Sequence, residues 1–271
     1  MTDNRRRGWS GVLGVAAFGL LLWLEHRDAL RATVENKERR VARNLAVAGV
    51  SALALQLAER PVSLPVARWV ERRRFGILQR LALPAWLETA LAVILQDYSL
   101  YIWHMLEHRL QPLWRFHAVH QVDIDLDAST ALRFHFGELV ASVPWRAAGI
   151  LVIGVTPESL ALYQRLLMLS IMFHHSNVKL PRTFERWLGW LIMTPRLHGV
   201  HHSTVEDELN SNWSSGLTLW DMLHGTLRTD VPQADITIGV PGYQEPQDVT
   251  LPKILEMPFT VAHISSGEPR A

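Results

Sequence analysis

The chain has 271 residues, of which 48% are hydrophobic and 20% charged, and its formal net charge is +1. The near-neutral charge argues against a dedicated nucleic-acid binder, and the absence of cysteine excludes disulfides, thiolate zinc sites and cysteine-ligated haem or iron–sulfur clusters. A chain this apolar that is also one-fifth charged must segregate its apolar residues into blocks, which indicates a membrane protein with a sizeable polar part.

Two apolar runs with basic flanks make up the first part of the chain. Residues 8–24 end without a small-residue cleavage site, so we expect an uncleaved membrane helix rather than a signal peptide. The polar, basic residues 25–44 follow, and the positive-inside rule places them in the cytoplasm. A second run covers 45–58. The connection 60–80 carries three consecutive arginines, so either it is an amphipathic interfacial piece or the topology differs.

Three further apolar runs follow, at 81–106, 137–155 and 157–173. The last two join near Thr156 and Pro157, where proline breaks the helix, and such a hairpin returns the chain to the side from which it entered. The histidine-rich stretches on either side of the hairpin can therefore meet on one face, which we expect to be cytoplasmic.

We therefore predict an all-α fold, an integral membrane helical bundle with about four spanning segments and a cytoplasmic histidine-rich helical cap. Three parts are expected along the chain. Residues 1–84 supply N-terminal membrane helices and basic loops, 85–228 a histidine-rich domain, and 229–271 a polar C-terminal tail.

Eleven of the thirteen histidines lie between residues 104 and 224, and they recur at spacings of three and four. Such spacings place imidazoles on one face of a helix, about a turn apart, where they can bind one metal ion. The histidines at these spacings are His104, His108, His117, His120, His198, His201 and His202. With His175 they make eight nitrogen donors, which is more than one tetrahedral ion uses and indicates two ions.

Imidazole suits zinc, copper, iron and nickel, so the ligand type alone does not identify the metal. The position is informative, because a site where membrane helices emerge is within reach of an acyl chain or sterol. Oxidation of an unactivated C–H bond there requires O2 chemistry and hence a redox metal.

Five ordered motifs carry a resemblance to a known family: HMLEH from residue 104, the run around HAVHQ at 117–121, FHHSNVKLP from 173, TPRLHGVHHS from 194 and LWDMLHGT from 219. Over about 85–228 the chain resembles the fatty acid hydroxylase and sterol desaturase superfamily. The resemblance implies a membrane enzyme with two Fe ions held by the eight histidines. It also implies O2 as co-substrate, and hydroxylation or desaturation of a fatty acyl or sterol-like lipid.

The chain departs from the family pattern at two positions. Gln121 stands where the second histidine motif normally ends in another histidine, so one ion has a weaker ligand or an open position there. His224 stands where the family has an apolar aromatic residue, and it is either a replacement ligand or, as we prefer, a solvent-facing side chain. His135 and His174 are further possible ligands.

Metal-bound imidazoles usually donate their other N–H to a carboxylate or carbonyl. Asp97 is the first candidate, because it lies seven residues before His104 on nearly the same helical face. Glu138 is a possible neighbour of the metals. The other candidates near the motifs are Asp123, Asn177, Asn212 and Asp221. The alternative for the DIDLD run at 123–127 is a solvated turn.

The chain has no nucleotide fingerprint, so its electrons must come from an external donor of the ferredoxin or cytochrome b5 type with a reductase. We expect the bacterial inner membrane, with the histidines facing the cytoplasm. A first rival is a membrane protein that binds or transports a divalent metal, although its helices show few ionisable residues. A second is a non-catalytic family member, which Gln121 alone supports.

Overall fold

The structure is a computed structural model and describes residues 2–260, which contain helices and no β-sheet. The helices of the first half are α1 (Thr2–Arg27), α2 (Lys37–Ala54), the π-helical segment η1 (Leu55–Glu59), α3 (Arg60–Arg73), α4 (Ile77–Arg80), α5 (Ala85–Arg109) and α6 (Gln111–Gln121). Those of the second half are η2 (Thr130–Leu132), α7 (Phe136–Ile153), α8 (Pro157–His175), α9 (Arg182–Leu188), α10 (Pro195–His201), α11 (Glu206–Leu209), α12 (Leu219–His224), η3 (Gln233–Asp235) and α13 (Leu251–Thr260). The predicted all-α class is confirmed.

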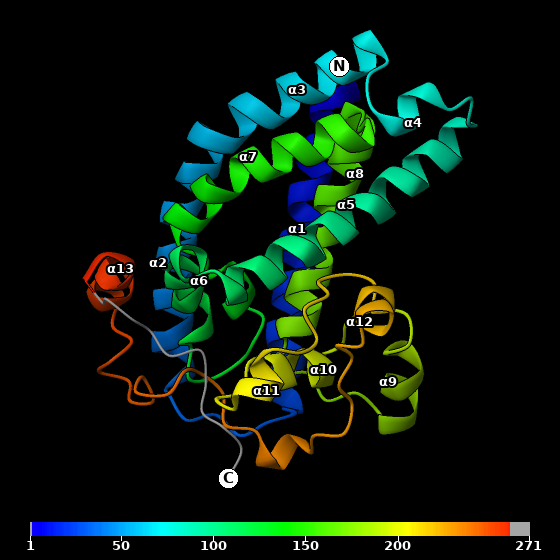
Figure 1. Cartoon of the computed structure of the whole chain (residues 1–271). Coiled ribbons are helices and arrows are strands. Elements are labelled where there is room, and N and C mark those ends of the chain that lie inside the picture. The colour runs from blue at the N-terminus through cyan, green and yellow to red at the C-terminus, as the bar shows by residue number, and fades with distance from the viewer. Residues whose placement is uncertain (1, 261–271) are drawn as a thin grey trace.

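Five long helical segments extend from one end of the molecule to the other (Figure 1). The segments α1, α5 and α8 descend from the end near the N-terminus, whereas α2–η1–α3 and α7 ascend towards it. All five cover the apolar runs expected from the sequence. Two stretches of the described residues, Lys37–Arg80 and Phe136–Ile153, are long and apolar enough to cross a membrane. The expected number of about four spans exceeds these two.

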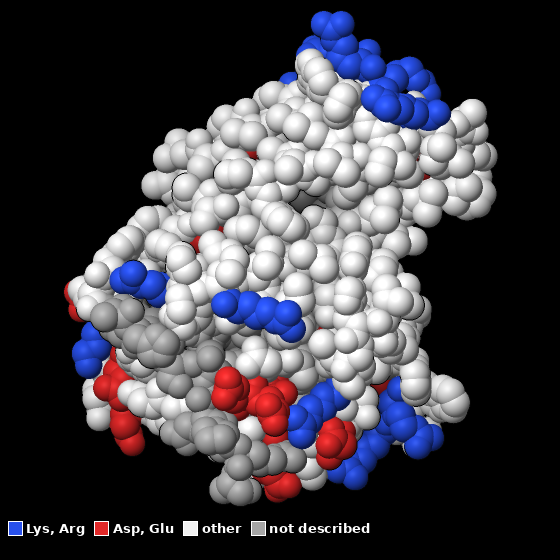
Figure 2. Space-filling model, in the orientation of Figure 1, with Lys and Arg blue, Asp and Glu red and all other residues white. Residues whose placement is uncertain are grey.

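Charge is distributed along the bundle in three zones (Figure 2). The end at the top is basic and corresponds to the tip of α3 and to α4, where Arg72, Arg73, Arg74 and Arg80 are exposed. A wide belt that shows few charged side chains in this view follows, and the lower part carries both acidic and basic residues. Such a belt between two charged zones has the form expected of a protein surrounded by lipid.

The connection 60–80 is mainly helical, and α3 continues α2 through η1. It ends in Arg74 with a left-handed backbone, and α4 begins after Gly76, whose φ is 93°. The chain is pressed here against the turn between α7 and α8, because a Cβ on Gly76 would overlap the backbone of Gly154. The three arginines of the connection therefore lie at the end opposite the histidines.

The C-terminal part is more ordered than the expected polar tail. Residues 236–250 are mostly irregular, but α13 is a helix that packs against α6 and α2. Val240, Val249, Ile254 and Met257 are buried with Trp114 and Val119 in one apolar cluster. The sequence pattern did not predict this packing, because the apolar residues of the segment are isolated among Pro, Gly and polar residues. The segment 240–257 thus packs behind the helix that carries His117 and His120.

Candidate metal centre

Eight histidines form two groups of four, each with its ligand atoms within 4.8 Å of one another. The first histidine cluster consists of His104, His108, His117 and His201. The second histidine cluster consists of His120, His175, His198 and His202. Every member is buried, and they come from α5, α6, α8 and α10 and the residue that follows α10. The structure therefore brings together the eight histidines that the sequence predicted.

The first cluster is oriented by two backbone carbonyls that lie close together in the chain. His104 Nδ1 donates to the carbonyl oxygen of Trp213 at 2.7 Å, and His201 Nδ1 donates to that of Ser211 at 2.9 Å. Between them Asn212 adopts a left-handed backbone, with φ of 51°. An imidazole that donates through Nδ1 presents a bare lone pair at Nε2, which is the form a metal ion requires.

Carboxylates orient a third member of the first cluster. His117 Nδ1 lies 3.2 Å from Glu138 Oε1 and 3.6 Å from Glu107 Oε2, and all three residues are buried. A carboxylate that accepts this N–H fixes the ring and raises the basicity of the other nitrogen. Glu138 was expected near the metals, whereas Glu107 was missed. Its place inside HMLEH is the pattern that would have found it, because it lies three residues after His104.

In the second cluster the Nε2 atoms face one another directly. His175 Nε2 lies 3.0 Å from His120 Nε2 and 3.0 Å from His198 Nε2, and His198 Nε2 lies 3.1 Å from His202 Nε2. His175 Nδ1 donates to the carbonyl of Ile171 at 2.7 Å, so its Nε2 cannot donate. Burial and the neighbouring rings lower the pKa of His120, His198 and His202 well below its usual value, which keeps these rings neutral.

The two clusters fit metal ions. Four nitrogens placed tetrahedrally at about 2.0–2.1 Å from an ion are about 3.3 Å apart, close to the distances in the second cluster. Among the described residues, the Nδ1 atoms of His108, His120, His198 and His202 are buried without a hydrogen-bond partner. The atoms that face one another in the second cluster are the Nε2 atoms, and buried nitrogen lone pairs in that arrangement are costly unless a cation lies between them. The eight imidazoles therefore have the chemistry of a site for metal ions.

Gln121 extends into the first cluster. Its amide nitrogen lies 2.8 Å from His201 Nε2, 3.4 Å from His117 Nε2 and 3.5 Å from His108 Nε2. Its Oε1 is buried and has no partner among the described residues. The two ends of a side-chain amide exchange places by one rotation, so Oε1 can face the position that the three imidazoles surround. Gln121 is thus at the site, as expected for a residue that replaces a histidine.

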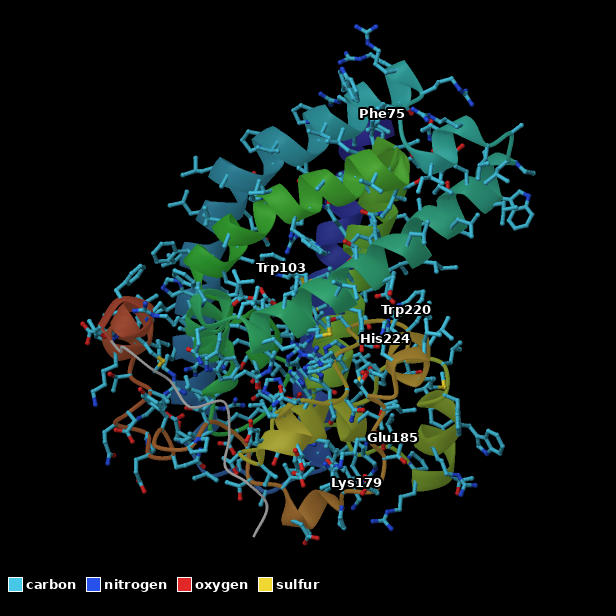
Figure 3. All side chains as sticks on the ribbon, viewed as in Figure 1. Phe75, Trp103, Lys179, Glu185, Trp220 and His224 are labelled. Carbon is cyan, nitrogen blue, oxygen red and sulfur yellow. The ribbon has the colours of Figure 1, made fainter. Side chains whose placement is uncertain are left out.

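A cavity of about 1070 Å³ leads from the histidines into the apolar belt. Its inner end is lined by histidines of both clusters, with Glu107 and Glu138, and its walls by residues of α2, η1, α3, α5, α7 and α8. Trp103, between α5 and α7, is on this wall (Figure 3). Such a volume is slightly above the range of about 300–1,000 Å³ that is usual for ligand cavities.

Asp97 does not contact a histidine, contrary to expectation. Seven residues of helix place it about 10 Å from His104 along the axis, although on the same face. Its carboxylate accepts from the backbone N–H of Leu217 at 2.9 Å and from Trp220 Nε1 at 2.8 Å, which fixes the loop before α12. Trp220 is directed towards α5 in Figure 3.

Asp221 and Asn212 act on the cluster through the backbone. Asp221 accepts from the N–H groups of Trp213 and Ser214, both at 3.0 Å, and so holds in place the Trp213 carbonyl that accepts the hydrogen bond from His104 Nδ1. Asn212 donates to the carbonyls of Leu197 at 2.8 Å and Arg228 at 2.9 Å. Neither side chain contacts a histidine, yet both fix the carbonyls that orient the first cluster.

Asp123 belongs to a buried ionic network rather than to the metal centre. It accepts from Arg40 Nη1 at 2.9 Å, Asn44 Nδ2 at 2.9 Å and Arg133 Nη1 at 3.1 Å. Burial alone would raise the pKa of Asp123, but Arg40, Arg133 and Arg43 hold it below its usual value. The alternative of a solvated turn is wrong, because the three aspartates of DIDLD are 4% exposed or less.

Three other candidates lie outside both clusters. His135 caps α7, where its Nδ1 accepts from the N–H of Gly137 at 2.9 Å, and its Nε2 donates to the carbonyl of Leu255 at 3.1 Å. His224 stacks on Tyr98 and Tyr101 at the exposed end of α12, as preferred from the sequence (Figure 3). Asn177 pairs with the backbone of Arg31 and so docks the loop after α1.

His174 is the nearest of the possible ligands to the centre. Its ring centroid lies 4.1 Å from that of His198 and 4.6 Å from that of His175, and it lines the cavity. It is not a member of either four-histidine group.

The comparisons with known proteins agree with this site. A family model described as fatty acid hydroxylase matches residues 89–226, slightly more than half of the chain. An ornithine lipid hydroxylase from Rhizobium tropici is 31% identical over 160 residues, which are 59% of this chain and 47% of that protein.

Vertebrate relatives are more distant. A cholesterol 25-hydroxylase-like protein from Danio rerio is 28% identical over 143 residues, 52% of this chain and 55% of its own length. The human alkylglycerol monooxygenase is 26% identical over 134 residues, 49% of this chain and 29% of its own. The chain thus spans about half or less of the length of these relatives. No solved structure matches.

Proposed function

Because this chain belongs to the fatty acid hydroxylase family, we propose that it is a membrane-embedded oxygenase that binds two iron ions and hydroxylates a lipid with O2. The observation that carries the proposal is the meeting of two four-histidine clusters with the inner end of a long cavity between apolar helices. Hydroxylation is preferred to desaturation because the relatives are named hydroxylases and monooxygenases.

Iron held by the two clusters would supply the redox chemistry that activates O2 towards a C–H bond. The residues of the chain itself bind the lipid and orient the histidine rings. The carbonyls of Ser211 and Trp213 fix the tautomers of His201 and His104, and Glu138 orients His117. The cavity wall holds the lipid with one methylene at the histidines and excludes bulk water from that end, which limits side reactions.

We further propose that the histidine end faces the cytoplasm, where a ferredoxin or cytochrome b5 type carrier can deliver electrons. The basic loop 25–44 supports this, because it docks at the histidine end, where Glu25 accepts from the N–H groups of Ala128 and Asn177. The arginines at the opposite end argue against it, and a direct test of orientation is described in the Discussion.

The test is metal content and Mössbauer spectroscopy on detergent-purified protein, together with O2 uptake that depends on a lipid and a reductant. We expect about two irons per chain as a coupled pair. His104→Ala and His201→Ala should lose metal and activity together, whereas His26→Ala, outside both clusters, should lose neither.

The rival functions make different predictions. Stoichiometric zinc that persists after iron supplementation, with no O2 uptake, would favour a divalent metal-binding protein or a non-catalytic member of the family. Ionisable residues within the helices are the feature that a transporter needs. Among the ionisable residues that line the cavity, Glu59 and Arg146 pair with each other, and Glu107 and Glu138 lie beside His117.

A further inference from the structure

One pair of charged residues lies in the middle of the apolar belt, far from the histidines. Arg146 is near the midpoint of α7, one of the two stretches apolar enough to cross a membrane, and Glu59 ends the π-helical segment η1 in the other. Arg146 Nη1 lies 3.5 Å from Glu59 Oε1, and Gln164 Nε2 of α8 donates to the same oxygen at 3.3 Å. Charged residues at such a depth are costly and are retained for function.

The three side chains face the cavity. Arg146, Glu59 and Gln164 all line it, and the Arg146 side chain keeps 33% of its surface exposed there. The only hydrogen-bond or ion-pair partner of Arg146 among the described residues is Glu59, so most of its five N–H donors are directed at no protein acceptor. The π-helical segment shifts the helical register just before Glu59, and such segments frequently occur at functional sites.

The position along the helices sets the distance from the centre. Arg146 lies eight residues beyond Glu138 on α7, and Gln164 lies eleven residues before His175 on α8. At 1.5 Å per residue, Arg146 lies about 12 Å along α7 from Glu138, which contacts His117. Gln164 lies about 16 Å along α8 from His175. The cavity wall also carries three exposed arginines. Arg68 lies nine residues after Glu59 along α3 and so further from the histidines, whereas Arg60 and Arg165 lie at nearly the level of Glu59 and Gln164.

On this basis, and resting on the proposed function, we propose that Arg146, Glu59 and Gln164 form a subsite for the neutral acyl carbonyl of an ester or amide lipid. The carbonyl accepts from Arg146, while the alkyl chain continues to the histidines. Glu59 compensates the charge of Arg146, so the subsite has no net charge. A free carboxylate would be repelled by Glu59, whereas a neutral carbonyl gains a hydrogen bond from a charged donor.

Arg68, which lies further from the histidines than the subsite, gives the lipid its direction. Arg68 suits a polar head group further out along the cavity, and the histidines lie at the inner end. The subsite between them would then fix which carbon of the chain reaches the histidines, because it holds the carbonyl at a set distance from the centre. It therefore determines both substrate class and position of oxidation.

The test measures binding without turnover. Detergent-purified protein is mixed in the absence of reductant with N-methylpalmitamide, palmitate or hexadecane, and the bound fraction is measured by native mass spectrometry. Wild-type protein should prefer the amide. Arg146→Leu should weaken amide binding about tenfold, equivalent to about 1.4 kcal/mol, and leave hexadecane unchanged. Arg182→Leu, on the exposed surface of α9 and outside the cavity, is the matched control.

Glu59→Gln supplies the decisive arm, because it is nearly isosteric and leaves Arg146 uncompensated. It should reverse the preference, so that palmitate binds better than the amide. Should Arg146→Leu fail to fold, Glu59→Gln and Arg146→Lys still give the result. Equal binding of all three probes to wild type and to Glu59→Gln would overturn the subsite but leave a lipid-binding cavity. Binding of none would overturn the proposed function as well.

Discussion

At the scale of single residues, the most informative position is Gln121, because it is a neutral amide among imidazoles. Its nitrogen lies nearest to His201 Nε2, at 2.8 Å, and its oxygen is buried without a partner among the described residues. Without a metal ion the amide N–H groups can satisfy the lone pairs of the first cluster. With an ion, only the oxygen can face it. Gln121 therefore changes its role between the two states.

This argument predicts the effect of Gln121→His. An imidazole binds late first-row metals more strongly than an amide oxygen, so the variant should retain more metal per chain after dialysis against a chelator. The measurement is elemental analysis at a series of chelator concentrations. Gln111→His, on the exposed start of α6, is the control. Equal retention by wild type and variant would mean that residue 121 does not face the ion.

At the scale of elements, the sequence was most reliable where a pattern was local. Each long apolar run became a helix, and the i, i+3 and i, i+4 spacings placed histidines on common faces of α5, α6 and α10. The sequence was least reliable for the hydrogen-bond partners of the histidine rings. Asp97 shares a helical face with His104, but the carbonyls of Ser211 and Trp213 orient the rings, and no side-chain pattern reveals a backbone acceptor.

The polar pair within the helices was missed for a related reason. Arg146 is a single charge in a long apolar run, and Glu59 follows the end of another. Only the approach of α7 to η1 shows that the two meet in a cavity wall. Contacts between segments far apart in the chain depend on packing, and one sequence does not record packing.

The turn between α3 and α4 carries a prediction at this scale. Gly76 has φ of 93°, and a Cβ there would overlap the backbone of Gly154, so Gly76→Ala adds strain and a clash with no flexible side chain to yield. We expect a loss of stability of about 2 kcal/mol or more, measured by thermal unfolding in detergent. Gly49→Ala, on the open surface of α2, should be neutral or stabilising. Equal melting of the two variants would contradict the contact.

At the scale of the whole molecule, the buried histidines make the metal-free protein sensitive to acid. Burial lowers the pKa of His201 from 6.5 to about 3 in the folded chain. Below about pH 6.5, His201 binds a proton in the unfolded chain but not in the folded chain. The stability of the fold therefore decreases as the pH falls towards 3. The loss is up to about 1.4 kcal/mol per pH unit for each such histidine.

The measurement is the melting temperature of metal-free protein between about pH 7 and pH 5. It should decrease steadily, and His201→Gln should lessen the slope, because the variant lacks one of the groups that titrate. A melting temperature that stays constant over this range would show that the rings are protonated or solvated in the folded protein.

The orientation of the protein in the membrane can be tested with single introduced cysteines, because the chain has no cysteine of its own. Arg73→Cys places a single thiol at the basic end, and Asp207→Cys places one on α11 near the histidines. In intact cells a membrane-impermeant maleimide should label the first variant and not the second. Labelling of the second alone would invert the proposed orientation, and labelling of both would mean that the belt does not cross the bilayer.

The two histidine clusters share their supports. Helix α6 gives His117 to one cluster and His120 to the other, and the consecutive residues His201 and His202 are likewise divided between them. The binding of one ion orders backbone segments that also carry ligands of the second ion. Loading should therefore be cooperative, so that a titration shows one steep step, and half-filled chains should be scarce even when metal is limiting.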